Sequence, residues 1–295
     1  METVHSLFRR VRKIEIHTRK LVDQLVGGDY KSIFRGHGME FSEFRAYTEG
    51  DDPRLIDWNV TARSGSPHVK VLTEERELMV MLLVDLSGSL RFGSVSLTKA
   101  ERVAEVAAVL ALSAARTNDR VGLLTFSDQV HEYVPPDKGR AHCLNLVQKI
   151  LDAPDRQVCA VPDTALKYLG RVMKRRSLIF LVSDFRFDQG KSRLLRAFSS
   201  RHDVVGVHVY DPRELHVPPI GRIRFRDPET GDSRTVDTSS PAWRKQFSKA
   251  VADIRQKREQ LWRDNRLDII SVSTADDLVL PLRRFFRLRK RRRLH

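Results

Sequence analysis

The chain has 295 residues, a net charge of +15 and only two cysteines, Cys143 and Cys159. This length fits one large domain with additions or two modest domains, each with a core that needs no covalent support. The cysteine count excludes a disulfide framework, and the spacing of the pair is not that of a metal site.

The hydropathy pattern contains neither a membrane-spanning segment nor a secretory signal. The longest purely apolar run covers residues 79–84, far short of the stretch of about 20 residues that crosses a bilayer. The first residues are charged and lack the apolar core of a signal peptide. The sequence therefore predicts a soluble, cytoplasmic protein.

The first part of the chain reads as a helix followed by mixed sequence. Apolar residues recur at helical spacing over residues 4–26, and Gly27-Gly28 ends that pattern. Residues 29–70 are rich in turn signals. We expect residues 1–68 to form an N-terminal helix and a segment that packs on a main domain over residues 69–282.

From Val69 onward, strands and helices alternate. Strands are predicted from Val69 into the apolar run that ends at Asp85, and then over 120–127, 177–185, 203–210 and 267–273. Helices are predicted over 97–116, 139–151, 163–174, 191–201 and 241–264, and a last helix from Asp276. Strands that are apolar on both faces belong inside a parallel sheet. The pattern predicts a doubly wound, mostly parallel α/β fold with helices on both faces.

An insertion and a basic end complete the organisation. Residues 219–238 read as a β-hairpin around the turn "DPETG". Residues 283–295 form a basic C-terminal tail that holds eight Lys and Arg and no acid. Such a segment is typical of weak contact with anionic membrane or nucleic acid, although a solvated end is the simpler interpretation. The residues proposed for this contact are Arg289, Lys290, Arg291, Arg292 and Arg293.

Oxygen-bearing side chains follow two of the predicted strands. Asp85 ends the strand in "VDLSGS" and precedes Ser87 and Ser89, and Asp184 ends the strand in "LVSDF". In an open α/β sheet, ligands collect beyond the carboxyl ends of the strands. Carboxylates and hydroxyls suit Mg²⁺, and also Mn²⁺. The sequence therefore predicts a metal site, although capping of the next turn by the serines would explain a lone motif.

These motifs resemble those of a known family. "VDLSGS" looks like the opening of the metal-ion-dependent adhesion site of von Willebrand factor type A domains, and "LVSDF" resembles their later strand end. The stretch 38–77, "RRSLIFLVSDF" and "DPRELHVPPIGRIRFRDPETGD" are similar to bacterial proteins of domain-of-unknown-function family fifty-eight. The resemblance implies a type A domain with insertions, and a non-enzymatic adaptor that works with a MoxR-type AAA+ ATPase or its client.

One position departs from the adhesion-site pattern that the resemblance implies. Type A domains take a third hydroxyl from a Thr, and its expected place is occupied by Ala160. Two alternatives stand open: Thr164 substitutes through a shifted loop, or the site lacks this ligand and binds metal weakly. No small-molecule substrate is expected.

The stretch "TEGDDPRLIDW" (48–58) allows two interpretations. One is a partner-binding or regulatory loop. The other is a turn capped by aspartates, in which Arg54 pairs with a carboxylate and Trp58 packs against the sheet. The second is favoured for Asp57 and Trp58, and the role of Asp51 and Asp52 stays undecided.

Two other functional classes compete with the adaptor. One is a metal-assisted phosphohydrolase with Asp85 and Asp184 on the ion, which lacks a nucleophile and a general base. The other is a nucleic-acid binder that uses the tail, which has only Phe285 and Phe286 as aromatic partners for bases. The sequence favours a metal-dependent protein-interaction module that is not an enzyme and that has a cytoplasmic location or a peripheral one at the inner face of the membrane.

Overall fold

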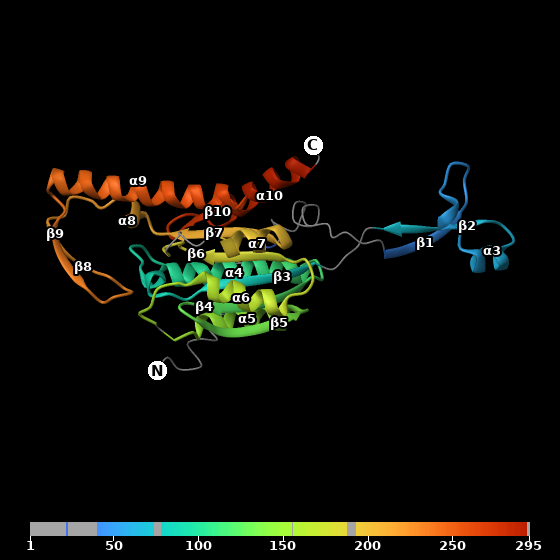
Figure 1. Ribbon diagram of the computed structural model, residues 1–295, viewed down its shortest axis with the longest axis horizontal. Helices are drawn as coiled ribbons and strands as arrows, with labels where there is room; N and C mark the ends of the chain where they lie inside the picture. Colours follow the sequence, from blue (N-terminus) through green and yellow to red (C-terminus); the bar gives the residue numbers. More distant parts are fainter. Residues whose placement is uncertain (1–21, 23–39, 74–77, 155, 188–192, 294–295) are drawn as a thin grey trace. The chain divides into compact units, whose positions relative to one another are not determined.

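The computed structural model describes residues 22, 40–73, 78–154, 156–187 and 193–293. The chain divides into two compact units, one formed by 34–78 and one formed by the rest (Figure 1). The helix expected over residues 4–26 lies outside the described residues except for Val22, which is helical and buried.

The smaller unit is built on a β-hairpin. Strands β1 (Glu40–Ala46) and β2 (His68–Thr73) pair in antiparallel register, and between them lie the short helices η1 (Pro53–Leu55) and α3 (Trp58–Ser64). The strand expected from Val69 therefore pairs with β1 rather than with the main sheet. The unit ends at residue 78, ten residues after the expected boundary. Apolar content alone does not reveal which strand a β-strand pairs with.

The larger unit contains a six-stranded sheet with the order β10-β7-β6-β3-β4-β5. Five strands are parallel, and β5 pairs with β4 in antiparallel register. This confirms the doubly wound, mostly parallel α/β class. The strands are β3 (Met79–Asp85), β4 (Arg120–Phe126), β5 (Val130–Asp137), β6 (Leu178–Ser183), β7 (Asp203–Tyr210) and β10 (Asp268–Ser273).

Helices cover both faces of this sheet. Met81 and Leu83 of β3 pack in one cluster with residues of α6 (Pro162–Val172) and α7 (Arg193–Arg201). The alternate residues of β3 point to the opposite face, where α4 (Lys99–Arg116) and α5 (Arg140–Leu151) contact the strands. The central strands are apolar and buried on both sides, which is why their sequences do not alternate.

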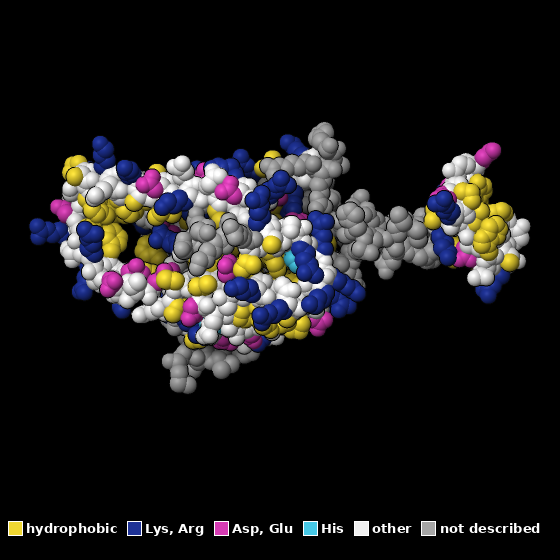
Figure 2. All heavy atoms as spheres, in the orientation of Figure 1, with side chains coloured by type: hydrophobic (Ala, Val, Ile, Leu, Met, Phe, Trp, Pro, Cys, Tyr) yellow, Lys and Arg dark blue, Asp and Glu magenta, His cyan; other side chains and the backbone are white. Residues whose placement is uncertain are grey.

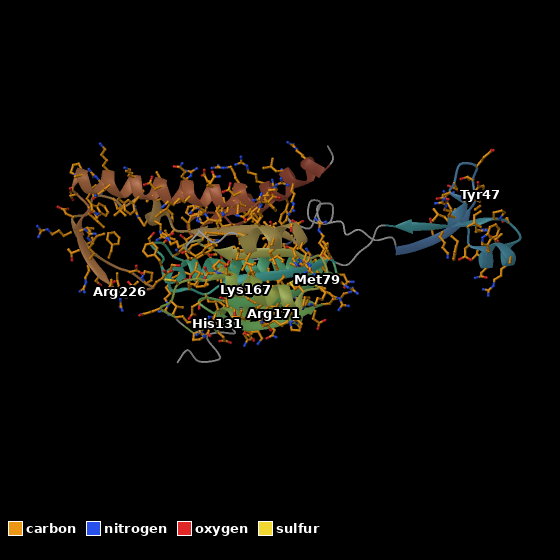
Figure 3. The ribbon with its side chains drawn as sticks, viewed as in Figure 1. Tyr47, Met79, His131, Lys167, Arg171 and Arg226 are labelled. Atoms are coloured by element: carbon orange, nitrogen blue, oxygen red, sulfur yellow. The ribbon has the colours of Figure 1, made fainter. Side chains whose placement is uncertain are left out.

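The expected hairpin insertion is present as β8 (Arg222–Arg226) and β9 (Ser233–Asp237). It follows the single-turn helix α8 (Pro212–Leu215) and precedes the long helix α9 (Pro241–Asp264). Met79, where β3 begins, and Arg226, where β8 ends, lie at opposite ends of the unit (Figure 3). The hairpin therefore lies at the end where the parallel strands have their carboxyl termini.

The described part of the basic tail is helical. Residues 283–293 continue α10 (Val279–Arg293), and Leu282 and Phe286 are fully buried. Arg289, expected on an anion-binding surface, instead forms ion pairs with Asp203 and, at 3.4 Å, with Asp268. The first part of the tail therefore belongs to the folded unit, because apolar side chains alternate there with the arginines. In the described chain, no helix has the length and apolarity needed to cross a membrane.

Candidate functional site

The topology brings two acidic strand ends together. In the sheet, β3 lies between β4 and β6. The chain passes from β3 to β4 on one side, and β6 later pairs with β3 on the other side. This is the switch point of a doubly wound sheet, where connections leave in opposite directions and open a crevice beyond the carboxyl ends. Asp85 is the last residue of β3, and Asp184 directly follows β6. The expected meeting of these two carboxylates is explained by the strand order.

Asp85 is completely buried and hydrogen-bonded on both oxygens. Its Oδ1 accepts the backbone N–H of Ser87 at 2.8 Å, and its Oδ2 accepts the hydroxyl of Ser183 at 2.6 Å. The Ser87 and Ser89 hydroxyls are 3.2 Å apart. The two serines and Asp85 therefore share one small polar volume, as the sequence predicted, and Ser183 completes it.

Asp184 is paired with a buried lysine. The ammonium of Lys99, the first residue of α4, lies 2.6 Å from Asp184 Oδ2 and 2.7 Å from Glu214 Oε1. Glu214 also lies 3.3 Å from a guanidinium nitrogen of Arg186. The Lys99 side chain has no solvent exposure. The strand-end site therefore contains its own cation, which the sequence analysis missed.

The two aspartates have opposite electrostatic surroundings. Burial and then the nearby charge of Asp184 raise the pKa of Asp85 to about 7, against the hydrogen bonds from Ser183 and Ser87. Burial alone would also raise the pKa of Asp184, but the charge and hydrogen bond of Lys99 outweigh it and lower that pKa. Lys99 thus stabilises the charge of Asp184 and leaves Asp85 without a comparable partner.

The position of the expected third hydroxyl is apolar. Ala160 is buried in the core cluster that also contains Met81 and Leu83. The loop before it does reach the site, since the carbonyl of Val158 accepts the backbone N–H of Gly88 at 3.0 Å. Thr164 lies in the first turn of α6, where its backbone N–H donates to the carbonyl of Val161. No described hydrogen bond joins its hydroxyl to Asp85, Ser87 or Ser89.

The site as a whole meets the requirements of a divalent metal ion only in part. The oxygens of Asp85, Ser87 and Ser89 are of the right chemical kind. Asp184, however, is already neutralised by Lys99, and Ala160 supplies no ligand. In the described chain, no three His, Cys, Asp or Glu side chains gather in a metal-binding group. The donor types fit Mg²⁺, but the charge balance of the set does not.

The inserted hairpin contacts the serine loop. A Cβ on Gly88 would lie 2.4 Å from the carbonyl oxygen of Pro228, in the turn between β8 and β9, and 3.0 Å from that of Arg156. Two backbone segments therefore approach this glycine closely. The hairpin turn is held internally, because Asp227 accepts the backbone N–H of Glu229 at 2.8 Å. Glycine is required here for close approach of the backbones.

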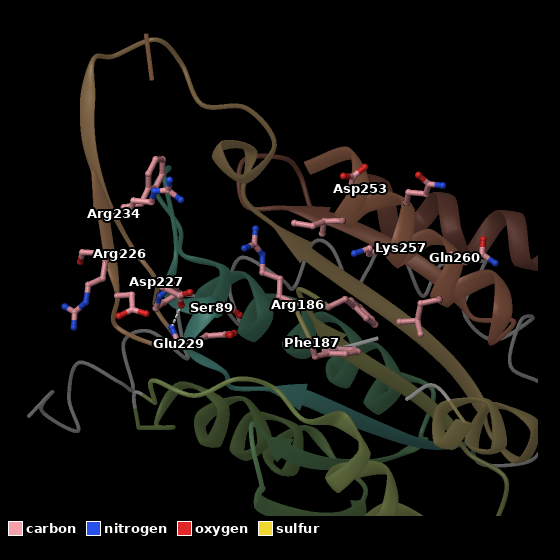
Figure 4. Close-up of a pocket in the computed structure, with 18 of the residues that line it drawn as sticks. Ser89, Arg186, Phe187, Arg226, Asp227, Glu229, Arg234, Asp253, Lys257 and Gln260 are labelled. Atoms are coloured by element: carbon pink, nitrogen blue, oxygen red, sulfur yellow. Dashed lines mark hydrogen bonds between the residues drawn. The ribbon is translucent and has the colours of Figure 1, made fainter. Parts of the chain in front are cut away.

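A groove opens beside the site, between the hairpin and α9 (Figure 2). Its volume is about 1370 Å³, and Ser89 is one of the residues that line it. Figure 4 shows Arg186 pointing into it, with Asp253, Lys257 and Gln260 on the α9 side. Phe225 and Ile254 add apolar surface. A second hollow of about 700 Å³ is lined by Asp85 and Ser87 on another side of the same loop.

The aspartates of the smaller unit have structural partners. Asp51 accepts two hydrogen bonds from Arg45, the shorter one at 2.6 Å. Asp52 accepts the backbone N–H of Arg54 at the start of η1. Asp57 caps α3 through the backbone N–H groups of Asn59 and Val60, and it pairs with Lys70 at 2.9 Å.

Trp58 does not pack against a sheet as expected. Its exposed fraction is 69% within the described chain. It is the first residue of α3. The cap is therefore the role of Asp57, and the neighbouring Trp58 lies on the surface of the smaller unit.

A serine–histidine pair occurs outside the predicted site. The Ser127 hydroxyl lies 2.6 Å from His131 Nε2, at the turn between β4 and β5. The Ser127 side chain is fully buried and donates to Asp128 Oδ1, so the carboxylate contacts the serine rather than orienting the histidine. This order differs from a catalytic triad, in which the carboxylate holds the histidine. The pair stabilises the turn.

Sequence reasoning missed Lys99, Ser183 and Glu214. The sequence did contain an indication for Lys99. A cation in the first turn of a helix is disfavoured by the helix dipole, which points to a compensating contact elsewhere. Ser183 directly precedes Asp184 at the same strand end. Glu214 is part of a capping box with Asp211 in α8, and that local role concealed its contact with a residue 115 positions away.

Comparison with known proteins gives the family. The model described as "Protein of unknown function DUF58" matches residues 43–257. An uncharacterised protein of Mycobacterium tuberculosis is 32% identical over 288 residues, which cover 97% of this chain and 90% of that protein. An uncharacterised protein of Mycobacterium avium is 32% identical over 162 residues, which cover 54% of this chain and 94% of the relative.

Two solved structures share part of the backbone arrangement. One is the conserved hypothetical protein BatB from Bacteroides thetaiotaomicron, with a TM-score of 0.46, 12% identity and coverage of 72% of this chain and 99% of that chain. The other is the SpRpn10 VWA domain, with a TM-score of 0.39, 13% identity and coverage of 69% and 92%. The sequence matches, rather than these structures, establish that the chain belongs to the family described as protein of unknown function DUF58.

Proposed function

We propose that this chain is a protein-interaction module without catalytic activity of its own, and that its contact surface is the groove between the β8–β9 hairpin and α9. The observation that carries this proposal is the groove itself. An insertion in the α/β fold builds one wall, a long exposed helix builds the other, and Ser89 of the switch-point site is among the lining residues. Ligands of doubly wound folds bind at this end of the sheet.

The chemistry of the groove suits a protein partner. Its walls combine the apolar surface of Phe225 and Ile254 with side chains of both charges. A protein surface offers the same mixture, whereas a small-molecule site is an enclosed and mostly apolar cavity. Arg186 and Lys257 point into the groove and would contact an acidic residue of the partner (Figure 4).

The absence of turnover chemistry supports a binding role. Around Asp85 and Asp184, the described neighbours are serines, Lys99, Glu214, Arg186 and His208, and Lys99 pairs with two carboxylates. Burial lowers the pKa of His208 to about 3, which makes it a weak base. Hydrolysis needs a nucleophile with a base to activate it. The phosphohydrolase alternative therefore has less support than the interaction module.

The family resemblance suggests which partner to test. It implies a MoxR-type AAA+ ATPase or its client, acting in the cytoplasm or at the inner face of the membrane. The Mg²⁺ or Mn²⁺ dependence that the resemblance implies is a separate question, which a chelator tests without changing the protein.

The test is recovery of the partner on the immobilised full-length chain, with the ATPase identified by mass spectrometry. Ile254→Asp places a charge in the groove, and we expect it to reduce recovery at least about tenfold. Ile220→Asp is the matched control, because Ile220 is 61% exposed but does not line the groove. Equal recovery by both variants would reject the groove as the contact surface.

Two further arms separate the metal and the enzyme questions. Recovery by Asp85→Ala and by wild type in EDTA, with circular dichroism to confirm folding, shows whether a metal contributes to the contact. Steady phosphate release by the pure protein, abolished in Asp85→Ala, would replace the interaction module with an enzyme.

A further inference from the structure

Lys99 is the largest fully buried side chain that carries a charge in the described chain. Its ammonium lies 2.6 Å from Asp184 and 2.7 Å from Glu214, both within hydrogen-bond distance. Burial of an ammonium is costly unless carboxylates surround it. The fold therefore brings two acids from different elements, the β6 end and α8, to this one cation.

The place of Lys99 in its helix points to a tertiary role. It is the first residue of α4, where the positive end of the helix dipole disfavours a cation. Helix initiation does not depend on it, because Thr98 and Glu101 already form a capping box. The lysine is thus unfavourable locally and is offset by contacts with residues 85 and 115 positions further along the chain.

The charges of the cluster show what the lysine does. The carboxylates of Asp184 and Glu214 pair with Lys99, Glu214 also pairs with the half-exposed Arg186, and Asp85 adds a third carboxylate close to Asp184. One negative charge is left when all are ionised, so a divalent ion would leave an excess of positive charge. Without Lys99, two negative charges would be left, which is the charge that a divalent ion neutralises.

We propose that the Lys99 ammonium is the resident cation of the strand-end site, and that it takes the place of a divalent metal there. Lys99 then determines the ligand preference of the site. The protein folds with a cation already bound to Asp184 and Glu214, and the hydroxyls of Ser87 and Ser89 with Asp85 do not act as a high-affinity metal site. The inference does not depend on the identity of any partner.

The experiment measures Mn²⁺ binding and Mn²⁺-dependent thermal stability of the pure full-length chain. Lys99→Met removes the charge and keeps a long unbranched side chain, and Lys99→Gln also keeps a hydrogen-bond donor. Lys149→Met is the matched control, since Lys149 pairs with the partly exposed Glu132 on α5 and β5. All proteins are titrated by calorimetry and melted with and without Mn²⁺.

We expect no Mn²⁺ effect on wild type or on Lys149→Met. Both Lys99 variants should bind Mn²⁺ at least about tenfold more tightly than wild type, because removal of one nearby positive charge is worth a tenfold change or more in a buried site. Mn²⁺ should raise the melting temperature of both Lys99 variants. Adding Asp85→Asn to Lys99→Met should abolish the gain.

Two results would overturn the proposal. One is a wild-type Mn²⁺ site of similar affinity that is lost in Asp85→Asn. The other is folded Lys99 variants that bind no better than wild type. If neither variant folds, even in Mn²⁺, the wild-type titration decides alone. No partner is present in these measurements. They therefore test the role of Lys99 independently of the groove, which is tested by partner recovery with Ile254→Asp.

Discussion

At the scale of single residues, Asp85 makes stability depend on pH. The pKa of an aspartate is about 3.9 in an unfolded chain, and burial raises it to about 7 here. The folded state thus holds this proton more tightly than the unfolded state does. Stability from this group is fully present below about pH 4 and is lost as pH rises through 7.

The variant Asp85→Asn removes that loss. We expect its free energy of unfolding to exceed that of wild type by a few kcal/mol at pH 8 and to differ little at about pH 3.5, as measured by urea titration in EDTA. Asp253→Asn, on the exposed part of α9, serves as the control and should show no such difference. A constant offset at both pH values would contradict the assignment.

Gly88 supports a second prediction at this scale. A methyl group in Gly88→Ala would meet two backbone carbonyls, so the variant should lose about 1–3 kcal/mol and expose the hairpin turn 227–231 to hydrogen exchange. Gly170→Ala is the opposite case, because its methyl group would meet no atom within 4 Å and Ala favours the helix α6. It should be neutral or stabilising. Equal effects of the two variants would disprove the close contact.

At the scale of elements, α10 combines core packing with a basic surface. Phe286 is fully buried and Leu288 is half exposed on the same helix. Phe286→Ala should therefore cost about 3–5 kcal/mol in thermal or urea unfolding, whereas Leu288→Ala should change stability by less than about 1 kcal/mol. A small effect at Phe286 would mean that α10 is not part of the core in solution.

The arginines of α10 divide in the same way. Arg284 and Arg291 are exposed, whereas Arg289 is paired with Asp203 and Asp268. Replacing Arg284 and Arg291 with Gln should weaken binding to vesicles that contain anionic lipid and reduce its dependence on salt. Arg289→Gln should lower stability and leave vesicle binding nearly unchanged. The reverse pattern would assign the anion contact to Arg289, one of the five residues that the sequence suggested for it.

At the scale of the whole molecule, each of the two compact units has its own β-sheet. Among the described strands, β1 and β2 pair with each other and not with the sheet of the larger unit, whose six strands form a sheet of their own. Replacing residues 40–73 with a Gly-Ser linker should therefore leave the main unfolding transition within about 5 °C of wild type, by calorimetry. A much larger decrease would show that the smaller unit stabilises the sheet.

The sequence by itself determined the alternation of strands and helices, the hairpin insertion, and the acids at two strand ends. These features are local: apolar runs indicate buried strands, helical spacing indicates helices, and Pro with Gly indicates the turn. The Asp85 loop was also predictable, because the residue order places Ser87 and Ser89 directly after the strand. Family membership followed from motifs that the chain itself contains.

Only the tertiary structure decided what surrounds Asp184 and which strand β2 pairs with. Lys99 and Glu214 are local features of their own helices in the sequence, and they meet only because the sheet order brings α4 and α8 to the end of β6. Strand pairing and ion pairing between distant segments depend on topology, which apolar periodicity does not encode. The cation at the strand ends therefore became visible only when the chain was folded.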